Sequence, residues 1–427
     1  MSKRDVFVKL LADAVSDRYK HVVARDIHIP LDTLKIISII GPRRSGKTHL
    51  LYSLINELRQ TVPPEHTIYL SCEDDRLYPL VLADMDDFIE TYYEQYPKAR
   101  DSVVYFFFDE IQEITHWEKF IRRIYDREKC RIFITGSSAK LLSREIGTAL
   151  RGRSLAYELM PLSFNEFLKF QQIEIRSPTS KSVSNLRHQL MRYMKQGGFP
   201  ELFFNPKEIH QKIIQEHLDV LLYKDVAERF GVTNTAALKY LLKYYCQNIG
   251  NRISVSKVFH IFKSQGYAIS KHTLYQYVDH LEEVYAIFRI SIYSTSIKKQ
   301  ARHPDKIYAA DAMYRHVTTV SEAWGNVLEN IMYLHYRRVG ETIHFYAGNH
   351  EVDFVLGPQH DLVNVCYDWN AESTRQREIL GLEEGMHIFK KKKSLLVTWD
   401  SETLIETSTG TITVQPAWKV LSGMRIS

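Results

Sequence analysis

The sequence has 427 residues, of which 44% are hydrophobic and 25% are charged. This balance is typical of folded domains and excludes a mainly disordered chain, a collagen-like chain and a coiled-coil rod. At roughly 100–200 residues per domain, the length predicts two to four domains. The net charge of +5 is too small to indicate a surface that coats nucleic acid.

The first third of the chain has the pattern of a parallel α/β sheet. A helical lead-in precedes Lys35–Ile40, which is β-rich and mostly apolar, as a buried parallel strand is. A glycine loop follows at residues 41–48, and then leucines and isoleucines recur at helical spacing. Further strands are predicted at Thr67–Leu70, Val103–Phe108 and Arg131–Ile134. Strands that alternate with helices predict one domain over residues 1–160.

The remainder divides into three predicted regions. Residues 161–235 have a helical pattern with few strands. Residues 236–320 contain three helical stretches followed by two strands, the order of a winged helix. Residues 321–427 predict a small mixed α/β domain with strands at Ile343–Tyr346, Val352–Leu356, Leu362–Cys366 and Ser394–Val397.

Residues 41–48, Gly-Pro-Arg-Arg-Ser-Gly-Lys-Thr, match the phosphate-binding pattern G-x-x-x-x-G-K-[ST] in full. The glycines allow backbone N–H groups to curl around phosphate, and the following helix directs its positive end at the same anion. We expect ATP here, with Lys47 reaching the β/γ-phosphates and the Thr48 hydroxyl contacting Mg²⁺. A chance match in a loop is the alternative. The predicted nucleotide contacts are Gly41, Pro42, Arg43, Arg44, Ser45, Gly46, Lys47, Thr48 and His49.

A second half of this site is predicted where the strand Val103–Phe108 ends in Asp109 and Glu110. We expect Asp109 to hold Mg²⁺, usually through a water, and Glu110 to act as the general base toward the attacking water. Thr135 and Ser137, after the next strand, are placed to orient that water or to sense the γ-phosphate. Two solvated acids and a plain Gly-Ser-Ser turn are the alternatives.

Arginines supply the remaining candidates, because an inserted arginine stabilises the charge that develops during phosphoryl transfer. Arg151 and Arg153 are the candidate catalytic arginines, acting on a neighbouring subunit; a solvated basic loop is the alternative. Arg43 and Arg44 either touch phosphate or fold back onto acidic side chains.

The compartment is indicated by the cysteines, Cys72, Cys130, Cys246 and Cys366, which form no CxxC pair. A reducing cytoplasm is therefore predicted. The longest purely apolar stretch, Val103–Phe108, is far short of the ~20 residues that span a bilayer, so we expect no membrane association.

Several motifs together make the chain resemble the AAA-type ATPases of bacteria and archaea that carry a C-terminal domain of unknown function. Besides the glycine loop, they include Phe-Asp-Glu-Ile-Gln (108–112), Leu-Arg-Gly-Arg-Ser (150–154), Gly-Gly-Phe-Pro-Glu (197–201) and Glu-Val-Asp-Phe-Val (351–355). The resemblance implies an ATPase domain, a helical extension, a winged helix and a restriction-nuclease-like C-terminal fold. It also implies oligomerisation or DNA association in some members.

A nuclease of that type needs an Asp on one strand and Glu-x-Lys on the next, with an upstream helix often adding a Glu. Glu329 and Asp353 fit the helix and the first strand, but Asn364 and Cys366 stand where Glu and Lys are wanted. We therefore interpret residues 321–427 as a degenerate nuclease fold without activity.

The predicted winged helix carries a divided charge. Its third helix begins with Lys271 and His272 but continues with Asp279, Glu282 and Glu283, which would repel phosphate. The segment from Lys298 to Lys306 is the better candidate for DNA contact, as a basic wing tip; a domain that only packs between neighbours is the alternative.

Three functions are consistent with these patterns. The first, which we favour, is a Mg²⁺-dependent ATPase that moves or assembles on DNA or a protein and acts as a homo-oligomer. The second is a nucleotide-gated binding switch with little turnover. The third is an ATP-regulated nuclease.

Overall fold

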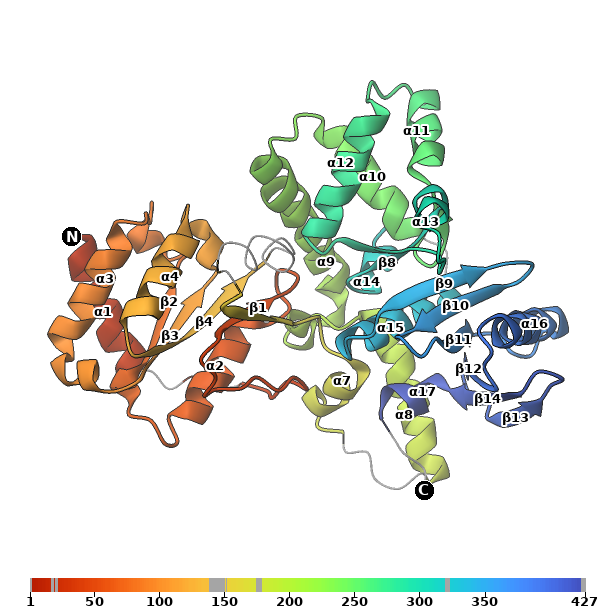
Figure 1. Ribbon diagram of the computed structural model, residues 1–427, viewed down its shortest axis with the longest axis horizontal. Coiled ribbons are helices and arrows are strands. Elements are labelled where there is room, and N and C mark those ends of the chain that lie inside the picture. The colour runs from red at the N-terminus through yellow and green to blue at the C-terminus, as the bar shows by residue number, and fades with distance from the viewer. Residues whose placement is uncertain are drawn as a thin grey trace. The chain divides into compact units, whose positions relative to one another are not determined.

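The computed structural model describes residues 2–16, 19, 22–137, 150, 152–173, 179–318 and 323–423. It divides into two compact units, residues 1–159 and 160–427 (Figure 1). No helix among the described residues is both long and apolar enough to cross a membrane.

The first unit is built on a five-stranded sheet in which every neighbouring pair of strands is parallel. The strand order is β2-β3-β4-β1-β5. The strands are β1 (Ile36–Ile40), β2 (Thr67–Ser71), β3 (Val104–Asp109), β4 (Cys130–Gly136) and β5 (Ser154–Glu158). The predicted parallel α/β fold is confirmed. Strand β5 was not predicted, because an edge strand that leaves Leu155 41% exposed has no continuous apolar run.

Helices cover both faces of this sheet, as Figure 1 shows. Alternation along β1 turns Ile37 and Ile39 toward one face, where they pack with the leucines of α2 (Lys47–Leu58). Ile36 and Ile40 turn to the other face and share a core with the remaining helices. These are α1 (Lys3–Ser16), α3 (Asp84–Gln95) and α4 (Trp117–Arg127). Because β1 is buried throughout, the loop that follows it begins from a fixed point.

The second unit opens with helices, some of them in the predicted winged-helix region. They are α7 (Phe164–Phe170), α8 (Ser180–Gln196), α9 (His210–Val220), α10 (Thr235–Gln247), α11 (Val255–Ser264) and α12 (Lys271–Glu283). A three-stranded antiparallel sheet follows in the order β6-β8-β7, with β6 (Arg252–Ile253), β7 (Ile287–Ile290) and β8 (Asp305–Ala309).

The predicted basic segment Lys298–Lys306 lies between the paired strands β7 and β8, and part of it forms the short helix α13 (Ile297–Arg302), which the Ser296 side chain caps. One residue of that segment departs from the prediction. Lys306 itself belongs to strand β8 and is only 2% exposed, so it is not a surface phosphate contact.

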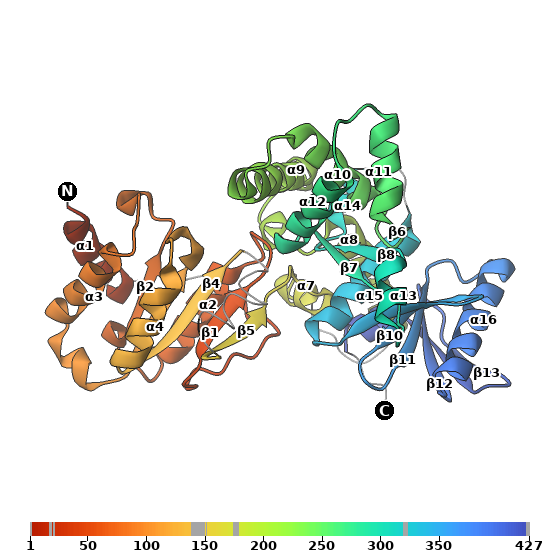
Figure 2. The ribbon, with the colours of Figure 1, turned by 45° about the horizontal axis from the view of Figure 1, so that its top comes forward.

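A six-stranded mixed sheet closes the second unit, in the order β13-β14-β12-β11-β10-β9. Its strands are β9 (Ile343–Ala347), β10 (Glu351–Leu356), β11 (Asp361–Cys366), β12 (Lys393–Thr398), β13 (Thr403–Glu406) and β14 (Thr411–Pro416). The helices of this region are α14 (Met313–His316), α15 (Trp324–Arg338), α16 (Glu372–Ile388) and α17 (Ala417–Leu421). Helices α15 and α16 lie on opposite sides of the sheet in Figures 1 and 2.

Candidate nucleotide-binding site

The glycine loop joins β1 to α2, and two of its glycines are required by its geometry. Gly41 has φ +152°, and a Cβ there would lie 2.1 Å from the carbonyl oxygen of Leu159. Gly46 has φ +98° and precedes α2, whose start carries no side-chain cap. A helix start without a capping side chain leaves N–H donors for an incoming anion.

Asp109, at the end of β3, is held by three hydroxyl donors from neighbouring elements. Thr48 Oγ1 donates to Oδ2 at 2.7 Å and Tyr69 OH donates to the same oxygen at 2.9 Å. The Thr135 hydroxyl donates to Oδ1. Burial raises the pKa of Asp109, although the bonds from Thr135 and Thr48 oppose that rise. The structure thus brings together the two residues predicted to hold Mg²⁺ and one predicted to sense phosphate.

Glu110 lies beside Lys47, with Oε1 3.4 Å from the Lys47 ammonium. Gln112 Nε2 donates to the other carboxylate oxygen at 2.6 Å, and the Glu110 backbone N–H donates to Thr135 Oγ1 at 2.8 Å. Burial opposes the charge of Glu110, but the charges and hydrogen bonds of its partners, Lys47 first, outweigh burial and lower its pKa. Glu110 is therefore a carboxylate at neutral pH, as a general base must be.

Lys47 is buried, and its contacts within the described part of the chain are all long. Besides Glu110, its ammonium donates to the carbonyl oxygens of Gly41 at 3.3 Å and Pro42 at 3.2 Å. The Ser45 hydroxyl is also buried and has no hydrogen-bond partner among the described residues. Both groups lie in the loop, and both fit an anion that would supply the missing acceptor.

The other predicted site residues differ in their surroundings. Arg43 folds back onto an acid, with Nη1 3.3 Å from Glu73 Oε1, while Arg44 and His49 are exposed. Ser137 is buried directly after β4. Arg153 Nη2 lies 3.2 Å from Asp126 Oδ1 of its own chain, and Arg151 lies outside the described residues.

Sequence reasoning missed three contributors to this site: Arg25, Tyr69 and Gln112. Arg25 Nη1 donates to the Ser45 carbonyl oxygen at 2.8 Å, across 20 residues of sequence. No motif marks Arg25 or Tyr69, and Gln112 lies in the motif at residues 108–112 but was given no role in the site. Tyr69 reaches the site because its strand, β2, pairs with β3.

Two family models match the chain, one described as an AAA domain over residues 33–168 and one as a domain of unknown function, DUF8612, over residues 187–322. The uncharacterized protein MJ1544 of Methanocaldococcus jannaschii is 33% identical, over 98% of this chain and 96% of that protein. The chain belongs to this family of AAA-domain proteins. An uncharacterized protein of Haemophilus influenzae is 30% identical, over 86% of this chain and 89% of its own length.

Among solved structures, the Walker-type ATPase PABY2304 of Pyrococcus abyssi aligns with 74% of this chain and 95% of its own, at 13% identity and a TM-score of 0.44. A likeness of this degree says nothing about ligands. The matched models name no nuclease, and the nuclease-like fold expected for residues 321–427 gains no support from them.

The second unit of this AAA-domain protein contains a buried lysine that the sequence did not single out. The Lys306 ammonium lies 2.9 Å from Glu329 Oε1, 2.7 Å from Glu351 Oε1 and 2.7 Å from Asp353 Oδ1. Burial alone would lower the pKa of Lys306, but the charges of Asp353 and Glu329 outweigh burial and raise that pKa. Tyr308 OH donates to Glu329 at 2.7 Å.

Lys306 and its three carboxylate partners line a cavity of about 810 Å³, close to the nuclease-like positions. Of these positions, Glu329 and Asp353 both form ion pairs with Lys306. Asn364 Oδ1 accepts from the Asp353 backbone N–H at 3.1 Å, and its Nδ2 donates to Glu378 Oε2 at 2.8 Å. Cys366 lines the same cavity. A metal ion between the carboxylates would have to displace Lys306, which already supplies the positive charge.

Proposed function

We propose that this AAA-domain protein binds ATP with Mg²⁺ and hydrolyses it. The observation that supports the proposal is the meeting of Lys47, Thr48, Asp109 and Glu110 at one edge of the parallel sheet. Mg²⁺, held by Thr48 and Asp109, would neutralise charge on the phosphates, since hydroxyl and carboxylate oxygens are its preferred ligands. Lys47 would exchange its long carbonyl contacts for the β/γ-phosphates.

Glu110 would take the proton of the attacking water, because it is ionised and lies beside Lys47. Thr135 would couple the two carboxylates, since its hydroxyl donates to Asp109 and accepts from the Glu110 backbone. Ser137, Arg43, Arg44 and His49 would complete the nucleotide contacts. Arg151 and Arg153 would act on the nucleotide of a neighbouring subunit, so the active form would be a homo-oligomer.

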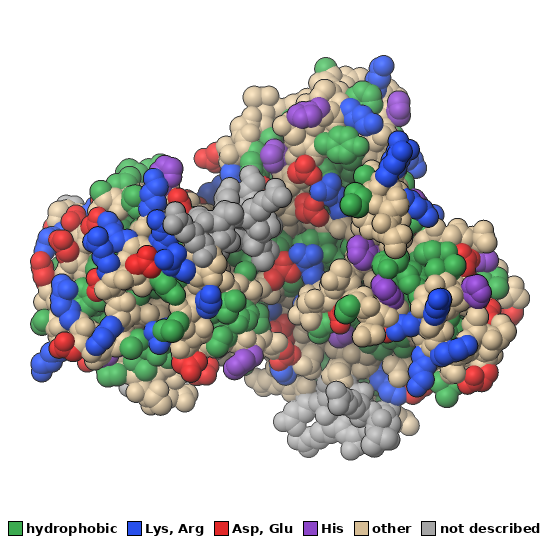
Figure 3. Space-filling model, in the orientation of Figure 1, with side chains coloured by type: hydrophobic (Ala, Val, Ile, Leu, Met, Phe, Trp, Pro, Cys, Tyr) green, Lys and Arg blue, Asp and Glu red, His purple; other side chains and the backbone are tan. Residues whose placement is uncertain are grey.

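Hydrolysis would be coupled to movement or assembly on a partner, either DNA or a protein. For DNA, the support is a basic surface on α13, where Lys298, Lys299 and Arg302 border a hollow of about 410 Å³. Figure 3 shows Lys and Arg side chains near this part of the second unit. The acidic end of α12 is partly neutralised, because Arg289 pairs with Asp279 and Glu282.

We also place the protein in the cytoplasm, because all four cysteines are free thiols.

A nucleotide-gated switch with little turnover is the second candidate function, supported by the same phosphate loop. No observation favours a nuclease, since Lys306 occupies the space between the carboxylates.

Glu110→Gln tests the hydrolysis step. It keeps the shape of the side chain but removes the base, so phosphate release should fall by about 10²- to 10⁴-fold while ATP binding is retained. The control is Glu94→Gln, a change of the same kind at an exposed position of helix α3. Release is measured with duplex DNA, single-stranded DNA and no DNA, over a range of protein concentrations.

If the wild type releases no more phosphate than Lys47→Ala does, ATP hydrolysis is rejected. The nucleotide-gated switch with little turnover then becomes the preferred function. Turnover per molecule that does not depend on concentration would reject an arginine supplied by a neighbour. Arg153→Ala should reduce turnover without changing ATP affinity, if Arg153 acts as proposed.

A further inference from the structure

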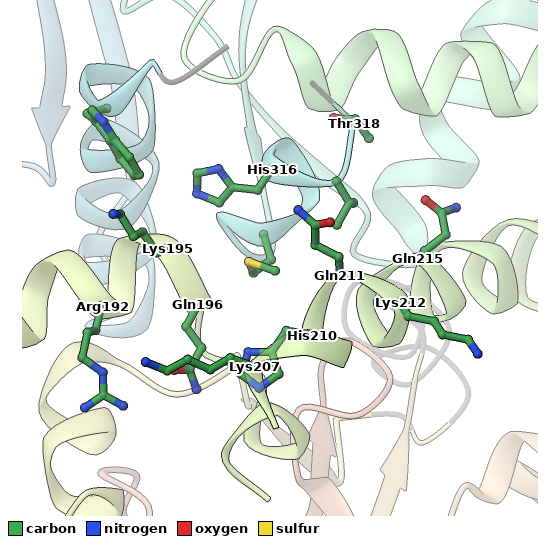
Figure 4. Close-up of a pocket in the computed structure, with 13 residues that line it drawn as sticks. Arg192, Lys195, Gln196, Lys207, His210, Gln211, Lys212, Gln215, His316 and Thr318 are labelled. Atoms are coloured by element: carbon green, nitrogen blue, oxygen red, sulfur yellow. The ribbon is translucent and has the colours of Figure 1, made fainter. Parts of the chain in front are cut away.

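A second basic site lies in the second unit, away from α13. Helices α8, α9 and α14, the turn Lys207–Ile209 and the start of α15 enclose a cavity of about 950 Å³ (Figure 4). Its basic side chains are Arg192, Lys195, Lys207, His210, Lys212 and His316. No Asp or Glu lines it among the described residues, and its other polar side chains are glutamines and a threonine.

The lysine and arginine side chains that line this cavity form no ion pairs with the described residues. Lys207 and Lys212 are exposed, and within the described ranges neither has a carboxylate within 4.0 Å. Arg192 Nη1 donates to the neutral Gln189 Oε1 at 3.0 Å, and the buried Arg192 Nε has no partner in the part of the chain that the structure describes. Four formal charges without a carboxylate among them favour an anionic ligand.

Two other contacts hold parts of the lining in place without an ion pair. The Lys195 ammonium lies 5.7 Å from the centre of the Trp324 ring. His210 Nε2 lies 2.9 Å from the Asn205 carbonyl oxygen, which can only accept, so Nε2 carries its proton. These contacts hold Lys195 and His210 at the cavity before any ligand arrives.

The charges surround the cavity instead of converging on one point. In Figure 4, Arg192 and Lys207 lie on one side, Lys195 lies above them, and Lys212 lies on the opposite side. A single phosphate group would contact only one of these sides. Phosphates repeated along a chain would contact several at once, and a concave cavity admits one strand more readily than the convex surface of a duplex.

We propose that this cavity binds the phosphate backbone of a single nucleic-acid strand. The site lies outside the ATP site and is distinct from the basic surface of α13, and strand binding there does not require hydrolysis. Strand binding would give the second unit a contact that depends on backbone charge and not on base sequence.

The test measures the anisotropy of a fluorescently labelled single-stranded oligonucleotide with the full-length protein, without ATP, from low to moderate salt. Each lost phosphate contact should reduce the slope of log affinity against log salt by about 0.7 for a single strand. Lys207→Gln with Lys212→Gln should therefore reduce it by about 1.4, and affinity at low salt should fall by about tenfold. Both lysines are exposed, so the variant should melt at the wild-type temperature.

The matched control is Lys243→Gln with Lys263→Gln, which removes the same charge from exposed positions elsewhere in the second unit. It should leave the slope within a few tenths of the wild-type value. An equal loss of affinity in this control would overturn the proposal in favour of general attraction. If affinity for the strand falls only in the double variant Lys298→Gln with Lys299→Gln, strand binding belongs to α13, and the proposal is also overturned.

Two further measurements identify the ligand and separate this site from the ATP site. Displacement of the strand by equimolar tripolyphosphate would show a site for free polyphosphate and overturn the assignment to a strand; displacement only at large excess supports it. Glu110→Gln should bind the strand like the wild type, so failure of ATP hydrolysis and failure of strand binding are separate results.

Discussion

Lys47 in the first unit and Lys306 in the second are both buried, but their surroundings are opposite. Lys47 is held by two carbonyl oxygens and one carboxylate, all at 3.2 Å or more. Lys306 is held by three carboxylates, all at 2.9 Å or less. Both lysines are nearly inaccessible to solvent, at 4% and 2% exposure.

The difference separates a lysine prepared for a ligand from one that serves the fold. An ammonium with long, mostly neutral contacts loses little free energy when it exchanges them for a bound anion. An ammonium that neutralises three carboxylates cannot be separated from them without a large cost in free energy. Burial alone therefore does not identify a functional lysine. The charge and distance of the partners that it already has are the better guide.

Lys306→Met should have the largest effect, because it leaves Glu329, Glu351 and Asp353 buried or half-buried without their cation. We expect the free energy of unfolding to fall by about 3–5 kcal/mol. Urea denaturation followed by circular dichroism measures this. Lys299→Met, on the exposed face of α13, is the control and should change stability by less than about 0.5 kcal/mol.

Lys47→Met should show the reverse pattern. Turnover should fall by at least about 100-fold, as for the loss of one stabilising charge at a reaction centre. The free energy of unfolding should fall by only about 1–2 kcal/mol, because Gln112 still donates to Glu110. Equal destabilisation by Lys47→Met and Lys306→Met would break the comparison.

Glu329→Gln should change how stability depends on pH. Burial raises the pKa of Glu329 to about 7, against the opposing charge of Lys306. Its ordinary value is 4.5, so the unfolded chain ionises first as pH rises. The contribution of Glu329 to the free energy of unfolding is therefore greatest below pH 4.5 and is lost as the pH rises to about 7.

The variant should therefore have a flatter stability curve between pH 5 and about 7 than the wild type, measured by urea denaturation across that range. Some slope should remain, since burial also raises the pKa of Asp311, to about 6. Glu341→Gln, an exposed change, should keep the wild-type curve. A Glu329→Gln curve parallel to the wild type would show that Lys306 keeps Glu329 ionised throughout.

Tyr69→Phe should have the smallest effect. It removes one donor to Asp109, but Thr48 and Thr135 still donate to that carboxylate. We expect a loss of about 1 kcal/mol in the free energy of unfolding, measured by thermal or urea denaturation. The control Tyr125→Phe should be neutral. A loss above about 3 kcal/mol would mean that Tyr69 is essential to the carboxylate.

The phosphate loop could be predicted because its residues are contiguous and their spacing is the signal. Asp109 and Glu110 could be predicted because they follow a continuous apolar strand. Lys306 could not, because its partners come from two elements, α15 and β10, and lie between 23 and 47 residues away. In the sequence it is simply the last cation of a basic segment, and only the pairing of β8 with its neighbours turns it inward.

The close approach of Gly41 to Leu159 has a mechanical consequence. The Leu159 N–H donates to the Ile40 carbonyl oxygen at 2.7 Å, so the last residue of the first unit is fastened directly before the phosphate loop. One covalent bond later the chain enters the second unit. A displacement of the loop would therefore be felt directly at Leu159, because no side chain lies between the backbone of Gly41 and that residue.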